Sequence, residues 1–317
     1  MTIQMGQGLM KLGAMVRIPV ALIRDHQMIE LMHDLKVKAT GPGQYGFSEK
    51  DALIVMYQDE GEYIAVPRQY ALEKFSRLIG DVGLEDGTSK GTKVDFRWVG
   101  DAEHLRRATE KGKPEWAEKQ RRFVEKLYQS LVDSPVHGAI GEAPTSFGKT
   151  VCAMKLLSMF GRTALVIVHK AFQLKQWKTA AMEWLQMAED EIGLVKGPVC
   201  EYEGKKIVLA MVETLSQHDY PKEFYEYFGV VMGDEVHRLG APQWSRAMPR
   251  FPAEVRVGIS ATPRRKDGLE RVFKWTIGPV GAREREWFVK AAVFQIAWPV
   301  YVEPRRYGIV HPARPGY

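Results

Sequence analysis

The stretch of the chain best suited to chemistry is residues 143–150, which read APTSFGKT. An apolar segment precedes it, and residues 151–160, which have helical character, follow it. A small-residue loop between a strand and a helix can wrap a triphosphate, because backbone N–H groups and the positive end of the helix face the anion. Lys149 would then reach the β- and γ-phosphates, and the Thr150 hydroxyl would bind Mg²⁺. Ala143 stands where this pattern normally has glycine, and the alternative interpretation is a turn with a surface lysine.

Two further segments predict strands that end in polar residues. Residues 228–233, FGVVMG, are typical of a buried strand and lead into Asp234 and Glu235. Asp234 would hold Mg²⁺, mostly through water, and Glu235 would polarise the water that attacks the γ-phosphate. Residues 257–262, VGISAT, form a shorter segment of the same kind. Three such signals in this order predict a phosphate-loop NTPase.

The same residues carry a family resemblance. The segments APTSFGKT, DEVH and SAT resemble motifs I, II and III of superfamily 2 helicases. Residues 258–269, GISATPRRKDGL, and 272–279, VFKWTIGP, resemble the XPB-like and UvsW-like branch, which phages and large DNA viruses often encode. The resemblance is strong over 116–280. It implies a RecA-like α/β fold with a parallel sheet and helices on both faces, the cofactors ATP and Mg²⁺, and nucleic acid as partner, with DNA favoured over RNA.

The resemblance also assigns roles to individual residues. It makes Lys149, Asp234 and Glu235 catalytic, and it gives the metal to Thr150 and Asp234. The nucleotide would contact Thr145, Ser146, Phe147, Gly148, Lys149 and Thr150. In this superfamily a glutamine upstream of motif I reads the adenine edge, and Gln120 is the candidate here. A plain surface glutamine is the alternative.

Other implied roles concern coupling and the nucleic acid. His237, Ser260 and Thr262 would couple the phosphate site to motion. The segment 169–177 resembles motif Ia and the segment 213–217 resembles motif Ib, so the nucleic-acid backbone would meet Lys170, Gln173 and Thr214. A threonine after a strand is also a common helix cap, which is the alternative for Thr214.

Composition and charge indicate a globular chain with a possible polyanionic partner. The chain has 317 residues, 45% of them hydrophobic, with a formal charge of +6. Cys152 and Cys200 fit no metal-ligand spacing, and we expect both to be small core residues in a reducing compartment. No apolar run approaches the length of a membrane span, so we expect a cytoplasmic protein without a membrane partner.

The chain order predicts a small α+β domain before the RecA-like domain. We expect a loose leader over 1–14, the α+β domain over 15–100, a charged linker over 101–114, the RecA-like domain over 115–280, and a connecting segment over 281–317. In the α+β domain, residues 52–57 and 63–68 predict a hairpin. Its basic and aromatic residues could face nucleic acid or form an ordinary solvated surface; they are Arg68, Tyr70, Lys74, Arg77 and Lys93.

Helicases of this superfamily need a second RecA-like domain, which supplies arginines to the transferred phosphoryl group. The 37 residues from Gly281 onward are too few for one, so we expect the second domain in cis or in trans and weak hydrolysis without it. The leading interpretation is an ATP-dependent helicase or translocase, acting in repair, recombination or replication. The alternatives are a non-motor nucleic-acid-binding module regulated by ATP, and the motor part of a restriction or nuclease system.

Overall fold

The computed structural model describes residues 9–38, 53–237, 242–261 and 269–286, together with the backbone of two short strands beyond them. Its centre is a sheet with the spatial order β11-β10-β12-β9-β13-β14-β8-β15. All neighbouring strands in it are parallel except the short edge pair β10 and β11. The strands are β8 (Gly138–Glu142), β9 (Ala164–Val168), β10 (Ile192–Lys196), β11 (Val199–Cys200), β12 (Ile207–Met211), β13 (Val230–Asp234), β14 (Val255–Ser260) and β15 (Val280–Arg283).

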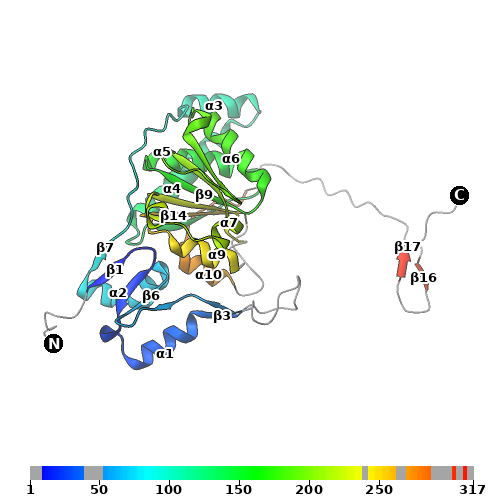
Figure 1. Cartoon of the computed structure of the whole chain (residues 1–317). Coiled ribbons are helices and arrows are strands. Elements are labelled where there is room, and N and C mark those ends of the chain that lie inside the picture. Colours follow the sequence, from blue (N-terminus) through cyan, green and yellow to red (C-terminus); the bar gives the residue numbers. More distant parts are fainter. Residues whose placement is uncertain are drawn as a thin grey trace.

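Helices cover both faces of this sheet (Figure 1). On one face lie α4 (Pro114–Asp133), α5 (Lys149–Phe160) and α6 (Ala171–Trp184). On the other lie α7 (Val212–Gln217), α8 (Lys222–Glu226), α9 (Pro242–Ala247) and α10 (Glu270–Thr276). The central strands are apolar throughout because alternate side chains enter two different cores, as in other parallel sheets covered on both faces. The predicted RecA-like α/β fold is confirmed.

The N-terminal part is a smaller α+β unit. Its sheet has the order β5-β6-β2-β1-β7, with two helices and a separate hairpin. The elements are β1 (Met10–Leu12), β2 (Val16–Pro19), α1 (Asp25–Asp34), β3 (Lys36–Lys38), β4 (Leu53–Val55), β5 (Gln58–Asp59), β6 (Tyr63–Val66), α2 (Arg68–Val82) and β7 (Leu84–Asp86). Single 3-10 turns lie at Val20–Leu22, Glu189–Glu191 and Met248–Arg250, and β16 (Val302–Pro304) pairs with β17 (Val310–Pro312).

Two boundaries predicted from the sequence are wrong. The leader expected over 1–14 contains β1, which pairs with β2 and β7; residues 1–8 lie outside the described part. The strand was missed because three residues are too few to show alternation. The linker expected over 101–114 contains α3 (Asp101–Glu110), and Gly112 and Pro114 mark the break between α3 and α4 instead of a flexible connection.

Three details of the predicted units also differ. Within the α+β unit, β4 pairs with β3, and the turn at Gly61 joins β5 to β6 instead. In the main sheet, β15 extends just beyond the predicted end at residue 280. Cys152 is buried in α5 as expected, whereas Cys200 is exposed at the sheet edge. Whether the two units fold independently stays a prediction.

Residues 87–100 connect the two units and run along the side of the main sheet (Figure 1). Ser89 forms a bridge with Ala253, and Lys93 forms one with Arg162. Gly91 has a φ of +59°, and a Cβ there would lie 2.4 Å from the backbone nitrogen of Gly229. This close approach and this backbone conformation both require glycine.

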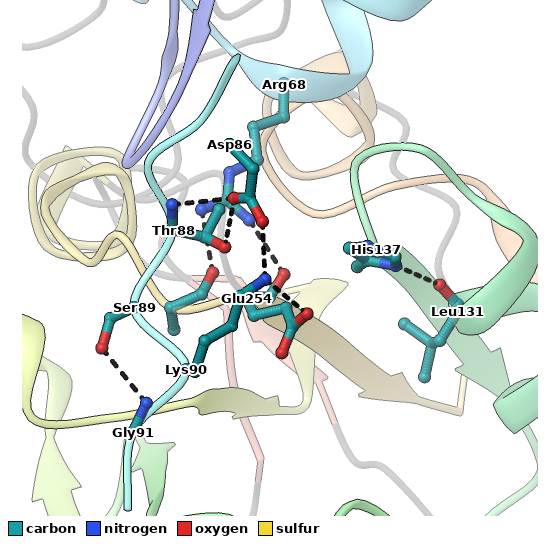
Figure 2. Close-up of polar contacts among 10 residues, drawn as sticks. Arg68, Asp86, Thr88, Ser89, Lys90, Gly91, Leu131, His137 and Glu254 are labelled. Carbon is teal, nitrogen blue, oxygen red and sulfur yellow. Dashed lines mark hydrogen bonds and ion pairs between the residues drawn. The ribbon is translucent and has the colours of Figure 1, made fainter. Parts of the chain in front are cut away.

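Buried arginines hold the α+β unit against the base of β14. Arg68 is 1% exposed and donates to the carbonyls of Gly13, Ala253 and Glu254 at 2.7, 2.8 and 3.2 Å. Arg256, at the start of β14, donates to the carbonyls of Ala14, Phe251 and Thr276. Burial lowers the pKa of Arg256 to about 9. Figure 2 shows Arg68 beside the ion pairs that Lys90 makes with Asp86 and Glu254.

The prediction that residues of α2 face nucleic acid is therefore wrong for the buried Arg68 and Tyr70, whereas it stays a prediction for the exposed Lys74. Arg68 is buried and bonds to backbone carbonyls, and Tyr70 is 1% exposed with its ring centroid 5.0 Å from that of Trp275. Lys74 pairs with Glu30 and Asp34. Arg77 and Lys93 are exposed, and their role stays a prediction.

We predict that Arg68→Ala lowers the free energy of unfolding by about 3 kcal/mol or more, because three carbonyl acceptors lose their donor and a cavity forms. Urea titration followed by circular dichroism measures it. The exposed Arg77, two turns further along α2, provides the control, since Arg77→Ala should change stability by no more than about 0.5 kcal/mol. Equal effects of the two substitutions would contradict the conclusion that the hydrogen bonds of Arg68 stabilise the protein.

Candidate functional site

The phosphate loop joins the end of β8 to the start of α5. Ser146 and Gly148 have φ values of +69° and +89°, which curl the backbone ahead of the helix. A Cβ on Gly148 would lie 2.3 Å from Nε2 of Gln120, so only glycine fits. Ala143 is fully buried, and its N–H donates to the carbonyl of Ser260 at 3.0 Å. Its methyl group packs in the core, which explains why this loop tolerates alanine at the first position.

The loop residues contribute in different ways. Thr145 and Ser146 are exposed, so their polar groups are open to a ligand. Phe147 is fully buried with its ring 5.3 Å from that of Phe123, so only its backbone can face a nucleotide. Since α5 begins at Lys149, its positive end points toward the loop.

The catalytic residues predicted from the sequence meet in the structure. Nζ of Lys149 lies 3.8 Å from Oε1 of Glu235 and donates to the carbonyl of Pro144 at 3.4 Å. Asp234 ends β13, and Glu235 follows it directly. Lys149 follows the loop after β8, and the acid pair lies at the end of β13; only β14 lies between these two strands. The parallel arrangement thus brings motifs I, II and III to one edge, where open α/β sheets bind ligands.

Glu235 is held in an unusual conformation. Its φ is +54°, a left-handed value that is uncommon for a residue with a side chain. Burial alone would raise the pKa of its carboxyl, but His237 and Lys149 outweigh that effect and hold the pKa below its ordinary value. Backbone strain of this kind gathers at functional sites, where surrounding contacts maintain it. The carboxylate is therefore ionised and aimed at Lys149.

Asp234 is more buried than Glu235 and depends on neutral donors. Burial raises the pKa of Asp234 above its ordinary value. Its Oδ2 accepts hydrogen bonds from Nε2 of Gln173 and from Nε1 of Trp177, each at 3.0 Å. Two fixed donors on one oxygen orient the carboxylate.

The residues present fit a magnesium nucleotide. Thr150 accepts a hydrogen bond from Gln176 at 3.4 Å and borders a groove of about 450 Å³ between α5 and α6. Within the described ranges, no group of three or more His, Cys, Asp and Glu is placed to hold a metal. Mg²⁺ keeps several waters and takes one or two carboxylates together with substrate phosphates, and Asp234 offers one such carboxylate.

Two of the predicted coupling residues join motif II to motif III. Nδ1 of His237 lies 2.9 Å from Oγ of Ser260 and 3.2 Å from Oε2 of Glu235. Ser260 is fully buried at the end of β14. The third predicted residue, Thr262, lies outside the described residues. His237 therefore connects the acid pair to the neighbouring strand.

Gln120, the residue predicted to read adenine, is buried next to the phosphate loop. It is 6% exposed; its Oε1 lies 2.6 Å from Nε2 of His104, and its Nε2 donates to the carbonyl of Phe147. Both ends of the amide are thus engaged within the protein, and one of them supports the phosphate loop. The alternative of a plain surface glutamine is therefore wrong, and the adenine-reading role stays a prediction.

Two of the three predicted nucleic-acid contacts also differ. Gln173 is 5% exposed and donates to Asp234, so its amide nitrogen is engaged within the protein. Thr214 is 6% exposed, and its hydroxyl accepts the N–H of Gly197 at 3.0 Å. Lys170 is exposed at the start of α6, where it remains open to a phosphate.

The sequence interpretation missed His104 and the bond from Trp177 to Asp234. Trp177 is 1% exposed, and its N–H donates to Oδ2 of Asp234. A buried tryptophan needs a partner for its N–H. The sequence could therefore have indicated that Trp177 donates a hydrogen bond near the end of a neighbouring strand. His104 had no signal, because the helix that carries it was taken for a linker.

Fold and site together define a phosphate-loop NTPase of the RecA type, and comparisons with known proteins narrow this further. Residues 113–265 match the family model described as type III restriction enzyme, res subunit. A protein of Acanthamoeba polyphaga mimivirus whose name proposes an ATP-dependent RNA helicase is 24% identical over 261 residues, covering 82% of this chain and 46% of its own length. The DNA 3'-5' translocase XPB2 of Sulfurisphaera tokodaii is 27% identical over 141 residues, 44% of this chain and 30% of the translocase.

A solved structure agrees with these sequence matches. The UvsW helicase from bacteriophage T4 superposes with a TM-score of 0.55 at 14% identity, over 87% of this chain and 100% of that one. Together the sequence matches and the shared fold support a superfamily 2 helicase core of the branch that contains XPB and UvsW. It spans less than half the length of the two curated relatives.

We predict that Gln120→Ala and His104→Ala weaken nucleotide binding by about tenfold each, because both remove support from the phosphate loop. Calorimetry with ATP and with GTP measures this. Since a supporting role acts on the phosphates, the two nucleotides should lose affinity equally. A loss confined to ATP on Gln120→Ala would support the adenine-reading role.

Proposed function

We propose that this chain forms the ATP-binding part of a nucleic-acid helicase or translocase. The observation that carries the proposal is the convergence of Lys149, Asp234 and Glu235 at the edge where β8, β14 and β13 end. His237 and Ser260 add a direct contact between that site and motif III. A motor needs a contact of this kind, because a change at the bound phosphates must be passed to a neighbouring strand before it can move another part of the protein.

Each residue has a defined task in this proposal. The loop backbone and Lys149 would bind the β- and γ-phosphates, while Thr150 and Asp234 would hold Mg²⁺, which neutralises charge on the phosphates when it is bound. Glu235 is ionised and would accept a proton from the attacking water. Glu235 is also the member of the acid pair that contacts Lys149 and His237.

The nucleic-acid contacts would be made to phosphates. Lys170 is exposed at the start of α6, close to the carboxyl edge of the sheet. The names of the two relatives point to different substrates: the viral name proposes an RNA helicase, and the archaeal name states a DNA translocase. We expect DNA, with binding that is insensitive to sequence and falls steeply with salt. Titrating matched DNA and RNA oligonucleotides at several salt concentrations tests this.

The described residues contain one RecA-like sheet. We propose that full hydrolysis requires a second RecA-like domain, in the same chain or another, whose arginines stabilise the transferred phosphoryl group. Such arginines typically raise turnover by about 10³-fold or more. Adding that domain should therefore turn weak ATPase activity into activity that nucleic acid stimulates.

A restriction or nuclease motor is the second candidate, because the matched family model describes a restriction enzyme subunit. The same motor core would serve it, so the nucleotide site does not separate the two candidates. Cleavage of duplex DNA by the natural complex would favour it over a helicase.

No helix among the described residues has the length and apolar character needed to cross a bilayer.

We predict that Lys149→Ala lowers ATP affinity by about 10- to 100-fold, because the substitution removes charge-assisted hydrogen bonds to phosphate. Calorimetry measures the affinity. Lys126→Ala, on the exposed face of α4, is the matched control and should leave it unchanged. Equal affinity in the parent chain and Lys149→Ala would rule out the phosphate-loop assignment.

We predict that Glu235→Gln keeps nucleotide affinity within about threefold and lowers turnover by about 10²-fold or more, because an amide cannot accept the proton from water. The measurement is nucleic-acid-stimulated ATPase in the presence of a second RecA-like domain. Glu125→Gln, on α4, serves as control. Unchanged turnover would mean that another residue is the base.

A further inference from the structure

Gln173 lies between the acid pair and the start of α6, and it bonds in both directions. Its Nε2 donates to Oδ2 of Asp234 at 3.0 Å. Its Oε1 accepts the backbone N–H of Lys170, also at 3.0 Å. One amide group therefore connects the carboxylate expected to hold Mg²⁺ with the residue expected to meet nucleic acid.

The side chain has little freedom to do anything else. Gln173 is 5% exposed, which is uncommon for glutamine, and its backbone N–H donates to the carbonyl of Lys170 at 3.0 Å. Because the amide is planar, its oxygen and nitrogen move together. A shift of the Asp234 carboxylate must therefore be followed by the amide or must break one of its two bonds.

Trp177 supplies an internal comparison. It lies one turn further along α6 and donates to the same oxygen of Asp234 at the same distance of 3.0 Å. Residues four apart lie on one face of a helix, so the two donors approach the carboxylate from adjacent turns. Of the two, only Gln173 also bonds to Lys170. Substituting Trp177 therefore weakens the hydrogen bonding of Asp234 alone, whereas substituting Gln173 also removes the bond to the start of α6.

The other end of the link is open to solvent. Lys170 is exposed, with Nζ 5.9 Å from the ring centroid of Phe172, whose side chain is 64% exposed. Its N–H, at the start of a 14-residue helix, would be unpaired without Gln173. The position of this basic residue thus depends on the amide that also holds Asp234.

We propose that Gln173 is a positioning residue that couples the Mg·ATP site to nucleic-acid binding at the start of α6. This inference rests on the proposed function and adds the route by which the two ligands influence each other. Binding at Asp234 changes the arrangement of the amide, and the amide changes the presentation of Lys170. Coupling of this kind is reciprocal, so nucleic acid must alter nucleotide affinity by the same factor.

The experiment measures that factor with a fluorescent, mixed-sequence DNA 30-mer and the non-hydrolysable analogue AMP-PNP with Mg²⁺. Anisotropy gives the Kd for the DNA with and without the analogue, and the ratio of the two values is the coupling factor. In the parent chain we expect a factor of about fivefold or more. In Gln173→Met, which keeps the length of the side chain but cannot form either bond, the factor should fall to about one.

Trp177→Phe is the matched control, because it removes one donor from Asp234 and leaves the bond to Lys170 intact. It should weaken analogue binding about as much as Gln173→Met does while keeping the coupling factor. Lys178→Met, on the exposed side of α6, should change neither quantity. If Gln173→Met does not fold, Gln173→Glu replaces it, since it retains the acceptor for Lys170 but repels Asp234; loss of coupling is again expected.

The outcomes separate the inference from the function on which it rests. If the parent chain binds neither the DNA nor the analogue, the proposed function is wrong and the inference with it. If the parent binds both but shows no coupling, or if the Gln173 variant keeps the coupling factor of the parent, the function stands and the inference is overturned. Equal loss of coupling in Trp177→Phe would also overturn it, because support of Asp234 alone would then explain the effect.

Discussion

The parallel register of β8, β14 and β13 is the constraint on which the site depends. Ser260 pairs with Glu142 across one strand boundary, and Ile259 pairs with Asp234 across the other. Because parallel strands all end at the same edge, this register brings the phosphate loop, the acid pair and the hydroxyl of Ser260 to one level. A shift by one residue would turn alternate side chains to the opposite face and separate these groups. Apolar side chains on both faces fix the register, so packing of the core determines the geometry of the site.

Burial of Asp234 explains much of the surrounding structure. A carboxylate with restricted access to water needs donors, and Gln173 and Trp177 supply them from α6. Burial raises the pKa of Asp234, whereas at Glu235 the effect of burial is outweighed by His237 and Lys149, which hold the pKa of that carboxyl below its ordinary value. Two adjacent acids thus acquire different environments, which suits the separate roles in metal binding and proton acceptance that we propose for them. The same logic places Gln120 and His104 beneath the phosphate loop, where an unpaired carbonyl of Phe147 would otherwise be buried.

Much of this could be predicted from the sequence, for identifiable reasons. Local patterns specify the strands and the residues at their ends, so the positions of Asp234 and Ser260 at strand ends and of Lys149 at the start of a helix agree with the sequence. Tertiary contacts decide which way a polar side chain turns, and spacing alone does not reveal them. Gln173 and Thr214 therefore turned out to be buried, although their segments resemble nucleic-acid motifs. The helix α3 escaped prediction because its buried residues, His104 and Ala108, give no apolar pattern.

Two buried arginines bond the α+β unit to the start of β14, the strand that ends in Ser260. Arg68 bonds to carbonyls just before β14, and Arg256 lies on β14 itself, four residues before Ser260. Arg256 in turn bonds to Ala14 in the turn between β1 and β2, so each unit donates to the backbone of the other. Because each guanidinium meets fixed carbonyls, small displacements of the α+β unit would leave buried donors unpaired. These bonds therefore hold the unit to the base of β14, at the end of the strand opposite to the carboxyl end where Ser260 meets His237.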